Sequence, residues 1–231
     1  MSIAENIREI REKIAAAAQE AGRNPEEITL CGASKMNDAA ACREAIRAGI
    51  DLLGENRVQE MTKKLAQHAY DGAPLHFIGH LQHNKVRQVV GKVALIHSIG
   101  SLPLLEEVQK QAEKRDLIQD VLLEVNIGGE ERKSGFAPGD LEDAAARAKA
   151  LPNVHVRGLM TIPPVEVVPH GNMEYFKEVH RLYVDISRDL YDNSFTYLSM
   201  GMSDDFEDAI LCGSTMVRVG SAIFGKRNYQ V

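Results

Sequence analysis

The feature that most constrains the fold of this chain is a regular alternation of strand-like and helix-like segments along its whole length. The strand-like segments are short, apolar and rich in β-branched residues, as in 121–125, and turn-forming or polar residues separate them from their neighbours. There are eight, at 28–35, 51–55, 75–79, 94–98, 120–126, 154–160, 197–200 and 217–220. Apolar strands that alternate with helices are typical of a parallel sheet covered by helices.

Helix-like segments follow the first seven of these strands, at 39–48, 58–68, 84–90, 103–114, 139–150, 173–190 and 204–212. One more helix precedes the first strand, because Ile3, Ile7, Ile10 and Ile14 recur on one helical face. Ser2 and Glu5 have the spacing of a capping box at its start. The chain therefore begins with an extra N-terminal helix.

Eight strands suit closure into a barrel better than an open sheet. The main alternative is an open doubly wound sheet, which usually carries a Gly-rich dinucleotide fingerprint after its first strand. Here that position reads Gly32-Ala33-Ser34-Lys35, which is not such a fingerprint. The sequence thus predicts an α/β fold, a single (β/α)8 barrel of the TIM type over residues 1–231.

Charge and cysteine content exclude several partners. Lys and Arg number 27 against 33 Asp and Glu, so no global cationic field attracts nucleic acid or a membrane surface. The lysines at 63 and 64 are interpreted as part of solvated helix faces. No secretory signal and no apolar run of transmembrane length occur. With three widely separated cysteines, a reduced, cytoplasmic protein is expected.

A metal site is not expected. His80 and His83 have the i, i+3 spacing of some metal ligands, but no cysteine or carboxylate cluster stands beside them to complete a coordination shell.

In a barrel of this type the active site collects at the carboxyl ends of the strands. The candidates at those positions are Lys35, Asn56, His80, Ser98, Asn126, Met160, Ser199 and Arg218. Lys35 closes the first strand among small and apolar neighbours, where burial favours the neutral amine that attacks an aldehyde. From its position alone, an ordinary surface lysine after a strand is the favoured interpretation.

The loops after the seventh and eighth strands contain Ser203, Gly220 and Ser221, in the region where such barrels commonly bind phosphate. Gly220 would let the backbone approach a phosphate closely, and Ser221 offers a hydroxyl and an N–H. The alternatives are a helix N-cap for Ser203 and a simple turn for Gly220.

Arg218 stands in the apolar strand that precedes Gly220. A guanidinium at such a position is costly without acceptors for its donors. Two interpretations stay open, a salt bridge inside the barrel and a contact with a ligand.

Several strings of residues, in order along nearly the whole chain, resemble the pyridoxal phosphate homeostasis protein family, the YggS- and PROSC-like proteins. They are Ala33-Ser34-Lys35, Gly54 to Glu60, His76 to Gln82, Asn84-Lys85, Lys133-Ser134-Gly135, Arg157 to Met160, Leu198 to Ser203 and Arg218 to Gly225. Met36 and His83 depart from the pattern, where a threonine and a smaller polar residue are usual; neither is assigned to the phosphate.

The resemblance implies a fold-type III barrel similar to that of alanine racemase, with pyridoxal 5′-phosphate (PLP) held as a Schiff base on Lys35. It also implies that Ser203, Gly220 and Ser221 hold the phosphate and that Arg218 faces the pyridine nitrogen. By the same resemblance, Asn56 lies beside the cofactor, and Ser199 and Met200 line it.

Racemases of this fold resemble a barrel joined to a second domain that supplies a catalytic tyrosine, whereas this sequence ends eleven residues after Gly220. The expectation is therefore a carrier that buffers PLP and hands it to PLP-dependent apoenzymes, with no strong catalytic activity of its own. A PLP-dependent amino-acid racemase is the alternative, and a Schiff-base aldolase without PLP is a third class. A monomer is expected, because no apolar helix face stands out as exposed.

Overall fold

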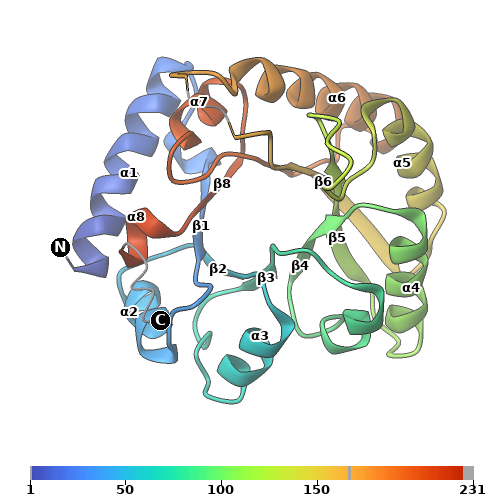
Figure 1. Cartoon of the computed structure of the whole chain (residues 1–231), viewed down its shortest axis with the longest axis horizontal. Coiled ribbons are helices and arrows are strands. Elements are labelled where there is room, and N and C mark those ends of the chain that lie inside the picture. The colour runs from blue at the N-terminus through green and yellow to red at the C-terminus, as the bar shows by residue number, and fades with distance from the viewer. Residues whose placement is uncertain (1, 166–167, 226–231) are drawn as a thin grey trace.

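The computed structural model describes residues 2–165 and 168–225. In this part of the chain eight parallel strands close into a barrel in sequence order, and helices surround it (Figure 1). The strands are β1 Thr29–Ala33, β2 Leu52–Glu55, β3 Leu75–Phe77, β4 Leu95–Ile99, β5 Gln119–Val125, β6 Val154–Thr161, β7 Tyr197–Ser199 and β8 Met216–Val219. The predicted (β/α)8 barrel is confirmed.

The α-helices are α1 Ile3–Glu20, α2 Ala39–Arg47, α3 Val58–Leu65, α4 Leu102–Glu113, α5 Leu141–Lys149, α6 Met173–Tyr191, α7 Phe206–Leu211 and α8 Ser221–Phe224. The described residues also form three short 3₁₀ helices in the connections: η1 Pro25–Glu27 before β1, η2 His83–Gln88 between β3 and β4, and η3 Pro138–Asp140 before α5. Among the helices described, none combines the length and the apolar character needed to cross a membrane.

The barrel closes where β1 pairs with both β2 and β8, so that Cys31 stands beside Leu52 on one side and Arg218 on the other. β6 and β7 approach closely at Gly158, whose φ is +145°. A Cβ added to Gly158 would lie 1.9 Å from the carbonyl oxygen of Tyr197, so only glycine fits here.

Successive residues of each strand point to opposite faces of the barrel wall. Leu198 belongs to the large apolar core between the strands and the helices. Inside the barrel are smaller apolar groups: Cys31, Ala33, Leu52, Ile78 and Met216, and separately Leu95, Leu122 and Met160. The barrel is therefore a packed core whose carboxyl end is left for the site.

The N-terminal helix α1 covers the junction of the first and last strands, beside α7 and α8 (Figure 1). Ser2 and Glu5 form the predicted capping box, with the Glu5 N–H 3.2 Å from Ser2 Oγ. The Asn6 amide donates to the carbonyl oxygen of Ile223 in α8 at 2.8 Å. The extra helix thus ties the chain before β1 to the chain after β8.

Two predicted helices differ from the structure. The segment predicted as a helix at 84–90 forms the 3₁₀ helix η2, with i to i+3 bonds such as that from the Lys85 N–H to the Gln82 carbonyl. It has no side-chain cap at Gln82, and Gly91 follows in a left-handed conformation, so a longer α-helix is not favoured. The helix predicted at 204–212 begins at Phe206.

Candidate functional site

Lys35 follows β1 and lies half-buried in the turn that leads to α2. The backbone on either side of it is held in place. The Asn37 N–H donates to the Ser34 carbonyl oxygen at 3.1 Å, and the Met36 N–H donates to Glu60 Oε2 of α3 at 2.7 Å. Met36 itself has a φ of 63°, in the left-handed region. The turn presents Lys35 at the carboxyl end of the barrel, as predicted.

A buried charged network lies directly behind Lys35. Lys64 Nζ donates to the Ser34 carbonyl oxygen at 2.8 Å and pairs with Glu55 Oε1 at 2.5 Å. The Ser34 hydroxyl and the Tyr70 hydroxyl donate to the same Glu55 oxygen, at 2.6 and 3.0 Å. Burial, with a further contribution from Glu55, raises the pKa of Tyr70, so its hydroxyl stays protonated and available as a donor.

This network corrects one sequence interpretation. Lys63 is exposed as expected, but Lys64 is only 5% exposed and points into the protein. Its position on the inner side of α3 brings it to Glu55, whose side chain is fully buried. The adjacent lysines therefore have opposite environments, which a charge pattern alone does not distinguish.

The predicted phosphate residues come from two loops that meet at the barrel mouth. The Gly220 N–H donates to Ser203 Oγ at 3.3 Å. A Cβ added to Gly220 would lie 3.3 Å from both the Cβ and the carbonyl oxygen of Ala33, which is tight packing against β1. Ser221 is exposed and begins α8. The alternative role for Ser203 is wrong, because Asp205 occupies the N-cap position of α7.

Arg218 lies on the inner face of β8 and is 4% exposed. Its Nη1 donates to Ser199 Oγ at 2.6 Å and its Nη2 donates to the Thr161 carbonyl oxygen at 2.9 Å. The ion pairs within 4 Å among the described residues do not include Arg218. Burial lowers the pKa of Arg218, but a guanidinium stays charged in proteins. A salt bridge inside the barrel is therefore not what holds it.

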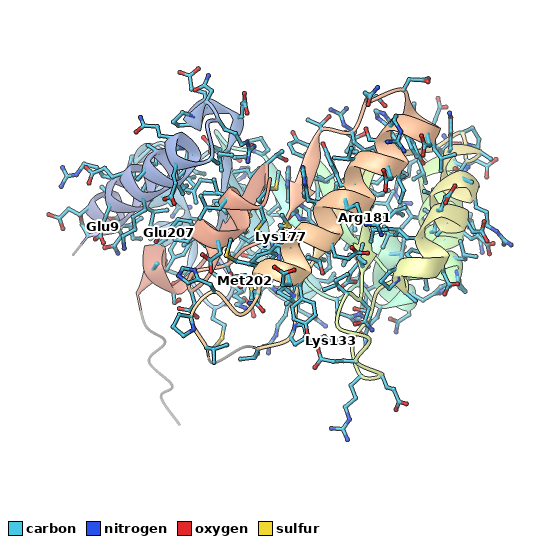
Figure 2. The ribbon with its side chains drawn as sticks, turned by 90° about the horizontal axis from the view of Figure 1, so that it is seen from above. Glu9, Lys133, Lys177, Arg181, Met202 and Glu207 are labelled. Carbon is cyan, nitrogen blue, oxygen red and sulfur yellow. The ribbon has the colours of Figure 1, made fainter. Side chains whose placement is uncertain are left out.

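A cavity of about 360 Å³ opens across the mouth at the ends of β2 to β6. Three of its lining residues have a buried oxygen with no hydrogen-bond partner in the structure: Asn56 Oδ1, Ser98 Oγ and Glu124 Oε2. Burial raises the pKa of Glu124. Lys133 lies on the cavity rim, on the loop after β5, which projects beyond the helices at one end of the barrel (Figure 2). The three unpaired oxygens of Asn56, Ser98 and Glu124 are suited to a ligand that carries hydrogen-bond donors.

Ser98 was among the candidates at the strand ends but had no assigned role, and Glu124 was not a candidate. The pairing of β4 with β5 shifts in register between Ile96 and Ile99, and Ser98 lies within that irregular stretch. Glu124 could have been noticed as the lone carboxylate in the apolar run 121–125. Its place in the cavity depends on the barrel geometry.

Ser199 and Met200 are adjacent in sequence but have different surroundings. The Ser199 hydroxyl lies inside the barrel, where it accepts from Arg218. The Met200 side chain belongs to the outer apolar core, in the same cluster as Leu198 and Phe206. A contact between Met200 and a cofactor stays a prediction.

Two histidines inside the barrel were also missed as functional candidates. His76 Nδ1 lies 3.0 Å from His97 Nε2, and His97 Nδ1 lies 3.1 Å from Ser199 Oγ. Burial lowers the pKa of both imidazoles, that of His76 to about 4. The signal in the sequence was a polar residue on the inward position of an otherwise apolar strand, as in Leu95–Ile99.

Groups of three or more histidine, cysteine, aspartate or glutamate side chains that could hold a metal ion are not found among the residues described.

Comparison with known proteins agrees with this architecture. The family model described as alanine racemase, N-terminal domain, matches residues 2–228. A pyridoxal phosphate homeostasis protein of Aquifex aeolicus is 44% identical over 229 residues, covering 99% of this chain and 100% of the relative. The protein of the same name from Escherichia coli K12 is 41% identical over 230 residues, covering 98% and 97%.

A solved structure of PipY from Synechococcus elongatus, described as having PLP bound, is 31% identical, with a TM-score of 0.83. The match covers 97% of this chain and 100% of PipY. Identity at this level over nearly all of each matched chain establishes common descent. The chain belongs to the pyridoxal phosphate homeostasis protein family, within the wider group that shares the N-terminal barrel of alanine racemase.

Proposed function

We propose that this protein binds PLP reversibly as a Schiff base on Lys35, buffers it, and delivers it to PLP-dependent apoenzymes, thereby contributing to intracellular vitamin B6 and amino-acid homeostasis. The observation that carries the proposal is the meeting of three features on the adjacent strands β7, β8 and β1. These are the Ser203–Gly220 contact, the buried guanidinium of Arg218, and Lys35 after the strand that pairs with β8. The PLP in PipY, a relative of the same fold, supports it.

The donors and acceptors present fit PLP. Ser203, Gly220 and Ser221 would hold the phosphate, because hydroxyl and backbone N–H groups are its usual ligands. Asn56 would lie beside the ring, with its orphaned buried oxygen as the acceptor. Arg218 is a buried cation with no carboxylate partner among the described residues, which suits a contact with the lone pair of a pyridine nitrogen.

Arg218 also bears on what the cofactor would do. A guanidinium, whose pKa lies above ~12, does not give up its proton to the ring, so the pyridine stays unprotonated and is a weaker electron sink. When bound, PLP supplies an aldehyde that captures amines. The residues of this chain would hold it by its phosphate and ring without strongly activating it, and this favours a carrier over a catalyst.

An amino-acid racemase is the second candidate, favoured by the match of 2–228 to the alanine racemase N-terminal domain. We expect the PLP-loaded protein to racemise alanine and serine no faster than the same concentration of free PLP. Chiral chromatography of the amino acids measures this. Racemisation well above the free-PLP background, lost in Lys35→Ala, would establish the enzyme instead. If the protein were a Schiff-base aldolase that works without PLP, it would be colourless and would not take up the cofactor.

The phosphate site is tested by combining Ser203→Ala with Gly220→Val. The first change removes a hydroxyl, and the second places a branched side chain against Ala33, so PLP affinity should fall by roughly tenfold or more while the barrel stays folded. Equilibrium titration followed by absorbance measures the affinity, and circular dichroism checks the fold.

The matched control for that pair is Ser101→Ala with Gly139→Val, which changes the same residue types away from the proposed phosphate site, at the N-cap of α4 and in η3. Gly139 has open space around its Cβ position. Equal affinity in both double variants would remove Ser203 and Gly220 from the phosphate site.

The cellular compartment and the oligomeric state of the protein belong to the same proposal. We propose that it is cytoplasmic and acts as a monomer. The three cysteines are free and buried, which agrees with a reducing compartment.

A further inference from the structure

A chain of four polar side chains crosses the inside of the barrel. It runs from His76 on β3 through His97 on β4 and Ser199 on β7 to Arg218 on β8. The three donor–acceptor distances are 3.0, 3.1 and 2.6 Å. The chain thus connects two pairs of strands on opposite sides of the barrel, and it ends at the residue proposed to face the cofactor.

All four side chains are buried, with exposed fractions of 4% for His76 and Arg218 and 0% for His97 and Ser199. The barrel interior also contains the apolar side chains of Leu95, Leu122 and Met160. Barrels are usually filled by branched apolar side chains at these positions. A buried polar chain is stable only where each member is satisfied, and it then holds its members in one arrangement.

Arg218 can only donate, so Ser199 Oγ is the acceptor of the Arg218–Ser199 bond. The single proton of Ser199 is then available to His97 Nδ1. In the arrangement in which His97 Nδ1 accepts this proton, the neutral imidazole carries its own proton on Nε2 and donates it to His76 Nδ1. His76 in turn carries its proton on Nε2. In this arrangement each hydrogen bond of the chain is donated in the direction away from Arg218.

The charge states agree with this assignment. Burial lowers the pKa of His76 to about 4, and burial, with contributions from His76 and Arg218, lowers the pKa of His97 well below its ordinary value. Both imidazoles are therefore neutral at pH 7, and the guanidinium is the one charge in the chain.

We propose that His97 and His76 are positioning residues that act through Ser199 to hold the guanidinium of Arg218 in the orientation that meets the ring nitrogen of PLP. The inference rests on the proposed function. The Thr161 carbonyl fixes one amino group of the guanidinium, and Ser199 Oγ fixes the other. A serine hydroxyl rotates freely unless its proton is held in a hydrogen bond. When His97 Nδ1 accepts that proton, the lone pairs of Ser199 Oγ keep one orientation toward Arg218.

The first test needs no cofactor. Long-range ¹⁵N–¹H correlation spectra of the assigned wild-type chain, recorded without PLP at pH 7, should show His97 and His76 as neutral imidazoles protonated on Nε2. A His97 protonated on Nδ1, or an imidazolium at either position, would overturn the proposed direction of the chain.

The second test uses the PLP-loaded protein and the variants Ser199→Ala, His97→Leu and His97→Asn. Ser199→Ala and His97→Leu should release PLP about tenfold faster and shift the absorbance band of the bound cofactor, because Arg218 loses a fixed acceptor. In His97→Asn the amide oxygen can take the place of Nδ1 as acceptor, so the release rate should stay within about twofold of wild type.

These variants separate positioning from stability. Asparagine leaves a void and a buried amide, whereas leucine nearly fills the space with apolar atoms, so His97→Asn should have the lower melting temperature. If the role of His97 were purely structural, the less stable His97→Asn would release PLP faster than His97→Leu. Finding that order would overturn the proposal.

Ser214→Ala is the matched control. Ser214 is a second fully buried serine beside β7 and β8, and its hydroxyl lies within 3.1 Å of three backbone carbonyl oxygens, outside the chain. It should lower the melting temperature and leave the cofactor band unchanged. If wild type fails to bind PLP, the proposed function fails; if wild type binds but Ser199→Ala and Ser214→Ala behave alike, only the positioning role fails.

Discussion

Replacing Lys35 by alanine is expected to abolish the covalent attachment of PLP. The wild-type protein, once loaded, should show an absorbance band near the edge of the visible range that sodium borohydride removes, because reduction converts an imine to an amine. Lys35→Ala should lack this band, since the Lys35 amine is gone and the neighbouring Lys64 amine is engaged by Glu55 and the Ser34 carbonyl oxygen. Peptide mapping after reduction should place the cofactor on the peptide that contains Lys35.

Lys63→Ala is the control for that experiment, since Lys63 is an exposed lysine on α3 and has no place in the proposed site. It should load and reduce like wild type. The phosphate residues are intact in Lys35→Ala, so weak, borohydride-insensitive binding of PLP is expected to persist. If the wild-type band survives in Lys35→Ala, another lysine carries the cofactor and the assignment is wrong.

The second large effect is on folding, and it concerns Lys64. Replacing Lys64 by methionine leaves the Glu55 carboxylate fully buried without its cation, although Ser34 and Tyr70 still donate to it. Removing one partner of a buried ion pair costs about 3–5 kcal/mol, a large fraction of the ~5–15 kcal/mol by which a domain is stable. Urea unfolding followed by circular dichroism should show a strongly lowered midpoint.

Two further variants separate charge burial from the loss of a lysine. Lys63→Met, on the solvent side of the same helix, should unfold close to the wild-type midpoint. Glu55→Gln combined with Lys64→Met removes both charges and keeps an oxygen for Ser34 and Tyr70, so it should be more stable than Lys64→Met alone. If the double variant loses as much stability as Glu55→Gln and Lys64→Met lose separately when their effects are added, the buried ion pair is not the cause.

The Lys64 network also links stability to the site. Lys64 donates to the carbonyl oxygen of Ser34, which is the residue before Lys35. Glu60 of the same helix accepts from the N–H of Met36, which is the residue after Lys35. The helix α3 therefore fixes the backbone on both sides of the proposed Schiff-base lysine. A variant that disturbs α3 is expected to affect PLP loading even though it touches no atom of the cofactor.

Two features of the proposed site bear on whether it holds the cofactor or activates it. A buried arginine with no carboxylate partner among the described residues suits recognition of an unprotonated pyridine, and a neutral chain of imidazoles behind it keeps further charge away. Both features favour holding the cofactor over stabilising a carbanion on it. The racemisation measurement decides between these roles.

The order of elements in this barrel could be predicted from the sequence, because strand and helix periods are local properties of neighbouring side chains. The sequence also predicted that Lys35, Ser203, Gly220 and Arg218 stand at one end, since parallel strands of a barrel all end on the same side. The capping box of Ser2 and Glu5 is local in the same sense, and it formed as predicted.

The pairing of polar residues, by contrast, depends on the three-dimensional fold. Lys63 and Lys64 look alike in sequence, yet only Lys64 meets Glu55, nine positions earlier and on a different element. His97 and Ser199 are separated by 102 positions and meet across the barrel. Such contacts depend on strand register and barrel closure, which bring distant residues within hydrogen-bond distance, and no local period encodes them.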